Sequence, residues 1–244
     1  MSLLIAALQL GVSFLALPVY VLNFLGLWDP ICKRLFPFIM SKLAVDYNKK
    51  MQQHKRELFS NLGDFVGPSG RLTLLEIGCG TGANFQYYPR GCKVTCVDPN
   101  PHFQQFLSKS LKENDHVECE RFLVTSGEEM AQVATGSVDV VVCTLVLCSV
   151  RSTEAVLREA KRVLRQGGAF YFMEHVTGDA SSWIFFFQQI YDPTWSRLFD
   201  GCQLTRETWK DLEQAGFAEL KLRHIMAPLT WNPVKPHILG YALK

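Results

Sequence analysis

The chain has 244 residues, of which 48% are hydrophobic, 20% charged and 12% aromatic, and its net charge is +2. This length is typical of one domain with an appendage. The composition excludes intrinsic disorder, because disordered chains combine low hydrophobicity with high charge. The balance of 25 basic and 23 acidic residues argues against a protein that binds nucleic acid through a general positive charge.

The first 28 residues contain no charged side chain, and Asp29 is the first. As a helix they would span roughly 42 Å, against about 30 Å for the hydrocarbon core of a bilayer. A cleaved signal peptide is disfavoured, because no basic residue precedes the apolar run and no small-residue cleavage site follows it. Residues 1–28 are therefore predicted to be a hydrophobic membrane helix, with a kink at Pro18.

Residues 29–66 are predicted to form a basic, amphipathic juxtamembrane region that contains a helix over 46–65. Seven Lys or Arg face three acidic residues between positions 29 and 60. Positive flanks stay on the cytosolic side, so the rest of the chain is expected to face the cytosol. A second apolar patch at 35–40, interrupted by Pro37, leaves open whether the chain crosses the bilayer once or inserts into one leaflet.

The cysteines indicate free thiols in a reducing compartment, since they fall on apolar runs and form no C-x-x-C pair. They are Cys32, Cys79, Cys92, Cys96, Cys119, Cys143, Cys148 and Cys202. No spacing is typical of a zinc site, so the sequence predicts no metal.

From residue 67 to residue 244, short apolar runs alternate with stretches of helical periodicity. The predicted strands are Leu72–Ile77, Lys93–Val97, Glu118–Val124, Val138–Thr144, Ala169–Glu174, Ala218–Ile225 and His237–Leu243. The predicted helices are Pro101–Lys112, Glu128–Val133, Thr153–Arg165 and Arg206–Gln214. This alternation predicts one α/β domain on a parallel sheet. Ligands of such sheets bind at the carboxyl ends of the strands, so the residues after each strand are the candidate site.

A glycine-rich loop follows the first strand. It reads Glu76-Ile77-Gly78-Cys79-Gly80-Thr81-Gly82. The glycines let the backbone turn tightly and approach a ligand closely. The spacing differs from the dinucleotide pattern G-x-G-x-x-G, and a carboxylate at Glu76 would repel a pyrophosphate. It would attract a ligand with an ammonium and a sulfonium group, as in S-adenosylmethionine.

The second and third strands end in further polar groups. Cys96-Val97-Asp98-Pro99-Asn100 closes the second strand and Thr125-Ser126-Gly127-Glu128 follows the third. A carboxylate at Asp98 can accept hydrogen bonds from both ribose hydroxyls. Ser126, Gly127 and Glu128 are predicted to meet the adenine edge, although Ser-Gly-Glu is also an ordinary helix start. Thr144 and Leu145, at the end of the fourth strand, complete the predicted cofactor site.

With these motifs in place, residues 72–244 resemble the class I S-adenosylmethionine-dependent methyltransferases. The glycine loop is similar to their cofactor loop, Asp98 to their ribose carboxylate, and 126–128 to their adenine-side turn. The resemblance implies S-adenosyl-L-methionine as cofactor. It also implies a Rossmann-like sheet of seven strands with helices on both faces.

The whole chain resembles a narrower family, the membrane-bound alkyl-thiol S-methyltransferases of the endoplasmic reticulum and lipid droplets. Three stretches carry this resemblance: Lys55–Ser60, Cys143–Val150 and Phe172–Val176. It implies that the substrates are small lipophilic alkyl thiols, with hydrogen sulfide as a further candidate. It also implies residence at those membranes. We expect a monomer.

A thiol is mostly protonated at neutral pH, so a base would assist methyl transfer. His175, directly after the fifth strand, is the predicted base, with a structural strand-end histidine as the alternative. Asp192 is the second predicted catalytic group. Cys143 and Cys148 either line the pocket or pack in the core. The aromatic stretch 181–199 is either a lid over a lipophilic pocket or a packing helix.

Three other functions remain open. The anchor also suits methylation of a lipid or quinone hydroxyl. RNA methylation is disfavoured and stable nucleic-acid binding is not expected, because residues 61–244 carry 18 basic against 20 acidic residues. A structural protein of lipid droplets would use the N-terminus alone, and the intact glycine loop with Asp98 argues against that.

Overall fold

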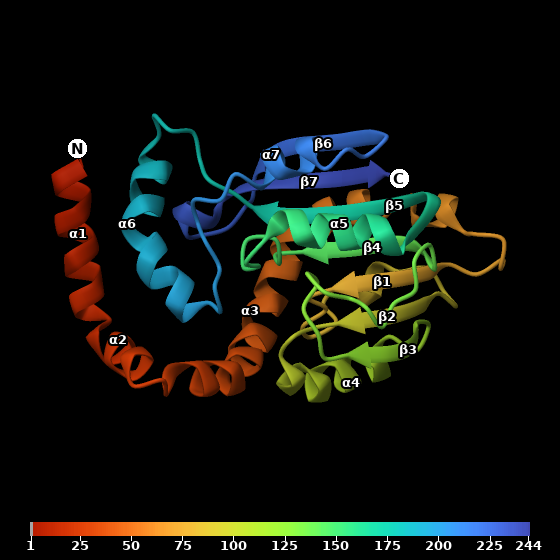
Figure 1. Cartoon of the computed structure of the whole chain (residues 1–244), viewed down its shortest axis with the longest axis horizontal. Coiled ribbons are helices and arrows are strands. Elements are labelled where there is room, and N and C mark those ends of the chain that lie inside the picture. Colours follow the sequence, from red (N-terminus) through yellow and green to blue (C-terminus); the bar gives the residue numbers. More distant parts are fainter. Residues whose placement is uncertain (1) are drawn as a thin grey trace.

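The computed structural model describes residues 2–244, so Met1, the first residue of the predicted anchor, lies outside the described residues. One sheet of seven strands forms its centre, in the order β3-β2-β1-β4-β5-β7-β6 (Figure 1). The strands are β1 (Thr73–Ile77), β2 (Lys93–Val97), β3 (Glu118–Leu123), β4 (Val138–Thr144), β5 (Leu164–His175), β6 (Glu219–Met226) and β7 (Pro236–Leu243). The predicted seven-stranded methyltransferase-like sheet is confirmed.

Strand β7 alone runs antiparallel to its neighbours β5 and β6. A short connection over residues 227–235 joins β6 to β7, and so short a link makes a hairpin because parallel strands need a longer crossover. β5 begins five residues before the predicted start, with a register shift against β4.

Helices cover both faces of the sheet. Leu74 and Val142 face a core that includes Met51 of α3 (Trp28–Leu58) and Leu107 of α4 (Gln104–Glu113). The residues next along the strands, such as Leu75, face the opposite core, which holds α5 (Thr153–Val163) and α7 (Thr208–Gln214). This alternation follows from the two-residue period of a strand.

The helix predicted over 46–65 begins much earlier, because α3 starts at Trp28 and continues through Pro37 for 31 residues. A 3-10 turn, Leu62–Phe65, follows it. The first half of α3 packs against the turn that follows β2, where Phe36 meets Phe103. α6 (Trp183–Leu198) lies beyond the carboxyl ends of the central strands (Figure 1).

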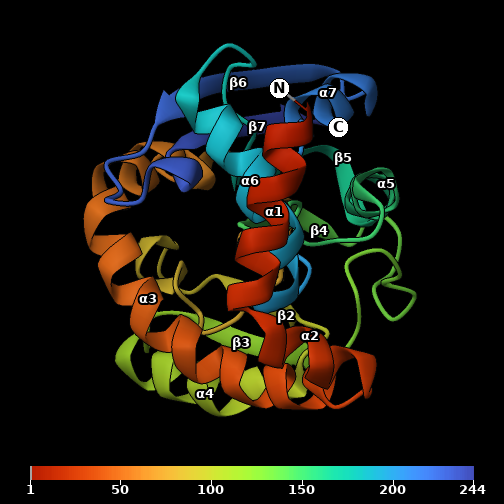
Figure 2. The ribbon, with the colours of Figure 1, turned by 90° about the vertical axis from the view of Figure 1, so that its left-hand side faces the viewer.

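The N-terminal apolar run forms two helices instead of the single helix predicted, α1 (Ser2–Leu15) and α2 (Leu17–Phe24). The chain bends by 78° between them, as expected from Pro18 in the first turn of α2. No single helix within residues 2–244 meets the length and hydropathy of a membrane span, although this bent pair meets them jointly. α1 lies along α6 (Figure 2), with Gln9 Nε2 donating to the carbonyl of Gln189 at 2.9 Å.

The helix predicted over Glu128–Val133 is wrong, because residues 124–137 form turns and irregular backbone. Glu128 uses its side chain on another element instead: its Oε1 accepts the backbone N–H of Ser152 at 2.7 Å, just before α5. Met130 and Val133 are buried in the core shared with α5. Tertiary contacts therefore override the local helical pattern here.

Candidate active site

The glycine loop after β1 needs its glycines for two reasons. Gly78, Gly80 and Gly82 all have positive φ angles, of 62°, 50° and 74°, which other residues adopt only with strain. At Gly78 an added Cβ would also lie 2.2 Å from Cγ2 of Val146. The loop thus brings bare backbone against the end of β4, with Cys79 and Thr81 between the glycines.

Glu76 is a buried carboxylate with one oxygen in use. Its Oε1 accepts a hydrogen bond of 2.8 Å from Nδ2 of Asn84, and no partner among residues 2–244 meets Oε2. Burial raises the pKa of this carboxyl to about 7. A buried oxygen without a partner costs free energy, so this position suits a cationic ligand.

Sequence reasoning missed the buried lysine behind Glu76. Lys55 of α3 is 2% exposed, and its Nζ donates to Oδ1 of Asn48 at 2.6 Å and of Asn84 at 2.7 Å. Burial lowers its pKa to about 8. Asn84 in turn donates to Glu76 and, at 3.0 Å, to Oγ1 of Thr144. One available signal was that Lys55 lies four residues after Met51 and three before Leu58, on the apolar side of α3.

Asp98 is fixed by backbone groups at the end of β2. Its Oδ2 accepts from the N–H of Gly80 at 3.0 Å and its Oδ1 from the N–H of Asn100 at 2.9 Å. Burial raises its pKa to about 6. Each carboxylate oxygen keeps a lone pair for another donor, so the group can still accept a pair of hydroxyls.

Helix α3 closes over this corner. Nδ2 of Asn100 donates to the carbonyl of Lys33 at 2.8 Å, and Phe36 meets Phe103 edge to face at 6.2 Å. Asn100 also accepts from the N–H of His102, which starts the turn that begins after Pro99. The first half of α3, in the region predicted to be juxtamembrane, is thereby joined to the predicted ribose site.

The predicted adenine-side turn lies next to β1. Gly127 has no room for a side chain, because a Cβ would lie 2.5 Å from Cγ2 of Ile77. Oγ of Ser126 accepts the N–H of Glu128 at 3.2 Å. The contact of 126–128 with adenine stays a prediction.

At the end of β4 the backbone turns sharply. Leu145 has a φ of 57°, rare for a branched residue, and the next N–H, of Val146, donates to Oε1 of Glu174 at 3.0 Å. Glu174 is buried, which raises its pKa to about 7. Cys143 is buried in the core shared with α5, and its Sγ donates to the same Oε1 of Glu174 at 3.8 Å.

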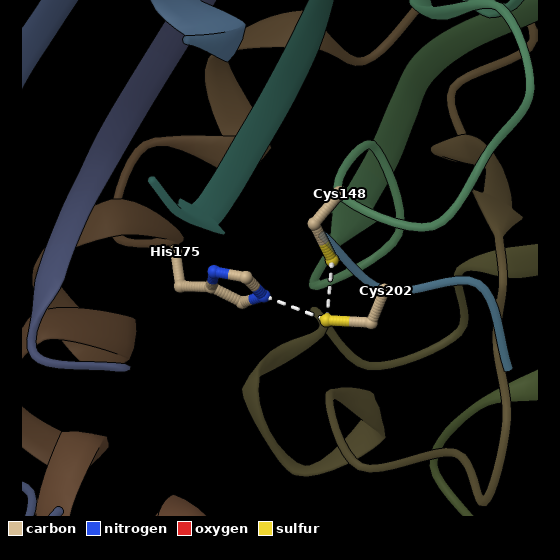
Figure 3. A group of neighbouring side chains, drawn as sticks. All are labelled: Cys148, His175 and Cys202. Carbon is tan, nitrogen blue, oxygen red and sulfur yellow. Dashed lines mark hydrogen bonds between the residues drawn. The ribbon is translucent and has the colours of Figure 1, made fainter. Parts of the chain in front are cut away.

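The two predicted catalytic residues, His175 and Asp192, contact different groups. Nε2 of His175 faces Sγ of Cys202 at 2.9 Å, while its buried Nδ1 meets no partner within residues 2–244 (Figure 3). Asp192 of α6 accepts the backbone N–H groups of Leu204 and Thr205 and so ties the helix to the loop after it. No hydrogen bond joins His175 to Asp192 in the described part of the chain. Their catalytic roles stay predictions.

The aromatic stretch 181–199 contains α6, which packs against the rest of the domain near the carboxyl ends of the strands. Gln188 is fully buried, and its Nε2 donates to the carbonyls of Val176 and Pro233 at 3.0 and 2.8 Å. Trp195 stacks on Trp231 with ring centroids 4.6 Å apart. The helix thus lies beyond the end of β5 (Figure 1), to which Gln188 ties it.

The residues present fit S-adenosylmethionine. The unpartnered oxygen of Glu76 offers a place for a cation, the glycine loop admits close approach of a ligand, and Asp98 has lone pairs left for hydroxyls. These three features lie at the adjacent ends of β1 and β2.

A family model described as a methyltransferase domain matches residues 75–172. Human thiol S-methyltransferase TMT1A is 62% identical over the full length of both chains, and human TMT1B is 55% identical over the same extent. Among solved structures, geranyl diphosphate methyltransferase in complex with GPP and sinefungin is 19% identical. It has a TM-score of 0.58, over 79% of this chain and 77% of that one.

Fold and site together define a class I methyltransferase whose cofactor is S-adenosylmethionine. Its full-length identity with both human enzymes places the chain more narrowly: it belongs to the thiol S-methyltransferase family.

Proposed function

We propose that the protein methylates the sulfur of small lipophilic alkyl thiols, hydrogen sulfide included, and yields methyl thioethers and S-adenosylhomocysteine. The observation that carries this substrate class is the 62% identity to human thiol S-methyltransferase TMT1A over the whole chain. Within the family, we further propose that the chain corresponds to methyltransferase-like protein 7A, which it resembles at Lys55–Ser60, Cys143–Val150 and Phe172–Val176.

The side chains of the site support this chemistry by binding and positioning. Bound S-adenosylmethionine supplies the methyl group and the leaving group. Glu76 would hold its cationic end, and Asn84, held by Lys55, fixes the orientation of that carboxylate. Asp98 would hold the ribose. Helix α6, with its aromatic side chains, would exclude water from the ends of β4 and β5, which would favour an uncharged, lipophilic acceptor.

A direct test uses the full-length protein with labelled cofactor and a panel of alkyl thiols, phenols and enols. Thiols should be methylated, and lipid or quinone hydroxyls should not. A sample that binds S-adenosylhomocysteine in calorimetry but methylates no thiol would overturn the substrate class while leaving the cofactor site intact. Turnover of quinol models instead would establish the alternative substrate class.

We also propose that the protein resides at the endoplasmic reticulum membrane and lipid droplets, inserted in one leaflet by α1 and α2, with the catalytic domain in the cytosol. Large apolar side chains on the helix pair are exposed, among them Leu10 at 75% and Phe14 at 73%. Trp183 of the adjacent α6 is 76% exposed. Apolar surface of this extent on neighbouring elements is typical of a membrane contact.

Vesicle flotation tests the membrane proposal. The protein should float with phosphatidylcholine vesicles, and the double variant Leu10→Lys, Phe14→Lys should stay in the dense fraction. Val66→Lys is the matched control, because Val66 is an exposed apolar residue ahead of β1, near the amino ends of the strands and so at the opposite edge of the sheet. Equal flotation of the double variant and the wild type would contradict the proposed contact.

A further inference from the structure

Three buried side chains with metal-binding atoms converge at the carboxyl edge of the sheet. Cys148 follows β4, His175 ends β5, and Cys202 lies in the loop after α6 (Figure 3). Nε2 of His175 and the two sulfurs all lie within 4.8 Å of one another. The three residues are 27 or more positions apart in sequence, so no spacing motif reveals them.

The distances are close to those of a tetrahedral zinc site. Zn–S bonds of about 2.3 Å and a Zn–N bond of about 2.0 Å at tetrahedral angles place two thiolate sulfurs about 3.8 Å apart, and a sulfur and a nitrogen about 3.5 Å apart. The two sulfurs of Cys148 and Cys202 are 3.6 Å apart, and Nε2 of His175 lies 2.9 Å from Sγ of Cys202. Of these two distances only the second must widen, by a fraction of an ångström, and the third pair, Cys148 and His175, lies within 4.8 Å.

The surroundings also suit a metal. Two thiolates and a neutral imidazole around Zn²⁺ carry no net charge, so burial of the occupied site is inexpensive. Nε1 of Trp195 donates to Sγ of Cys202 at 3.2 Å, the kind of outer hydrogen bond that orients a metal-bound thiolate. The same cluster without a cation leaves both thiols buried with only weak contacts to each other and to Nε2 of His175.

We propose that Cys148, His175 and Cys202 bind a zinc ion and that its fourth position takes the sulfur of the acceptor thiol. Two cysteines and a histidine are a known donor set for zinc sites that keep one position open. No fourth metal-binding side chain joins the group within residues 2–244. The assignment of the fourth position rests on the proposed thiol methylation, whereas the three-ligand site stands without it.

The metal would supply the step that a neutral thiol lacks. Coordination removes the S–H proton, which leaves to solvent, because a metal-bound thiol is deprotonated. The thiolate sulfur then forms a bond to the methyl carbon as the sulfonium carbon–sulfur bond breaks, and that electron pair stays on the leaving sulfur. The product is an uncharged thioether, a weak ligand that dissociates. His175 is then a ligand and not a proton acceptor.

The location agrees with this role. β1, β4 and β5 are neighbours, so His175 is two strand spacings, about 10 Å, from the strand that carries Glu76. Asn84 already links Glu76 to Thr144 at the end of β4. Cys202 lies in the loop after α6, so the three-ligand site forms only when that loop is packed in place.

The test is the metal content of full-length protein purified in detergent without chelators. We expect about one zinc ion per chain, and less than a tenth of that in Cys148→Ala and Cys202→Ala. Cys92→Ala, a buried cysteine outside the cluster, should keep the wild-type content. Binding of S-adenosylhomocysteine, measured by calorimetry, should be unchanged in all three, which shows that they fold.

A second measurement reports on the fourth position. Cobalt-substituted protein should show a thiolate-to-cobalt absorption band that intensifies when an alkyl thiol is added and is absent in Cys202→Ala. Metal-free wild-type protein with full thiol methylation overturns the proposal, as does active enzyme in which Cys148 and Cys202 form a disulfide. A zinc site in a protein without thiol turnover would instead refute the proposed function and would leave the proposed three-ligand metal site standing.

Discussion

The two halves of the site are built differently. The cofactor half uses Glu76 and Asp98, 22 residues apart, which sit at the ends of adjacent strands and are held by backbone N–H groups or a buried amide. The proposed acceptor half combines Cys148, His175 and Cys202 from three separate segments, one of them a loop outside the sheet. Recognition of the constant ligand is therefore local and rigid, while the acceptor side depends on how α6 and its loop pack.

The comparison predicts that the strongest effect on cofactor binding comes from Asp98. Asp98→Ala removes the acceptor of two backbone N–H groups and of the predicted ribose hydroxyls. Charge-assisted hydrogen bonds contribute about 1.5–3 kcal/mol each, so cofactor affinity should fall at least ~100-fold. Calorimetry with S-adenosylhomocysteine checks this. Asp115→Ala, a change at an exposed acidic residue, is the control. Near-normal affinity in Asp98→Ala would refute the prediction that Asp98 binds the cofactor.

Two glycine-to-alanine variants distinguish the stability cost of backbone strain from the cost of close packing. Gly78 and Gly70 have similar φ angles, 62° and 72°, but an added Cβ clashes with Val146 only at Gly78 and meets nothing within 4 Å at Gly70. Both alanine variants should lose about 1–2 kcal/mol of stability from the left-handed backbone. Gly78→Ala should lose a further ~1–3 kcal/mol from overpacking and most of its cofactor affinity. Thermal unfolding measures this, and equal losses in both would show that the contact with Val146 is unimportant.

The buried carboxyls predict a pH dependence of cofactor binding. With its pKa raised to about 7, Glu76 carries a proton in the free protein below neutrality. A cationic ligand favours the ionised form, so affinity should rise by up to about tenfold per pH unit towards pH 7 and then level off. In Glu76→Gln the curve of cofactor affinity against pH should level off at about pH 6 instead, because the pKa of Asp98 is about 6. An unchanged profile in Glu76→Gln would contradict this assignment.

The same shift has a consequence for stability. The folded protein holds the Glu76 proton to a higher pH than the unfolded chain, whose carboxyl titrates near the ordinary value of 4.5. Between pH 4.5 and about 7 the folded state therefore binds more protons, and the contribution of Glu76 to the free energy of unfolding falls as pH rises. Denaturant unfolding of wild type against Glu76→Gln measures this contribution.

The sequence was sufficient to predict the seven-stranded sheet and to place Glu76 and Asp98 at the ends of neighbouring strands, while their contacts with the cofactor stay predictions. The central strands could be predicted because buried parallel strands are largely continuous apolar runs, as in β2 and β4. The positions of Glu76 and Asp98 could be predicted because each lies at or directly after the end of its strand. Lys55, Asn84 and Cys202 were missed. Lys55 belongs to a surface-helix pattern in which lysine is normally exposed, and Cys202 reaches the site only through the packing of α6.

The smallest effect is expected at Asp192, whose role depends on how the loop after α6 packs and so could not be assigned from the sequence. Its carboxylate accepts the N–H groups of Leu204 and Thr205, next to Cys202, so it positions the acceptor loop. Asp192→Asn keeps one acceptor oxygen and should raise the KM for thiols only a few-fold, with cofactor affinity unchanged. A direct proton-transfer role would instead lower kcat by ~100-fold or more. Because Asn cannot act as a base yet can hold the loop, the split between KM and kcat decides whether Asp192 acts on the thiol or on the loop.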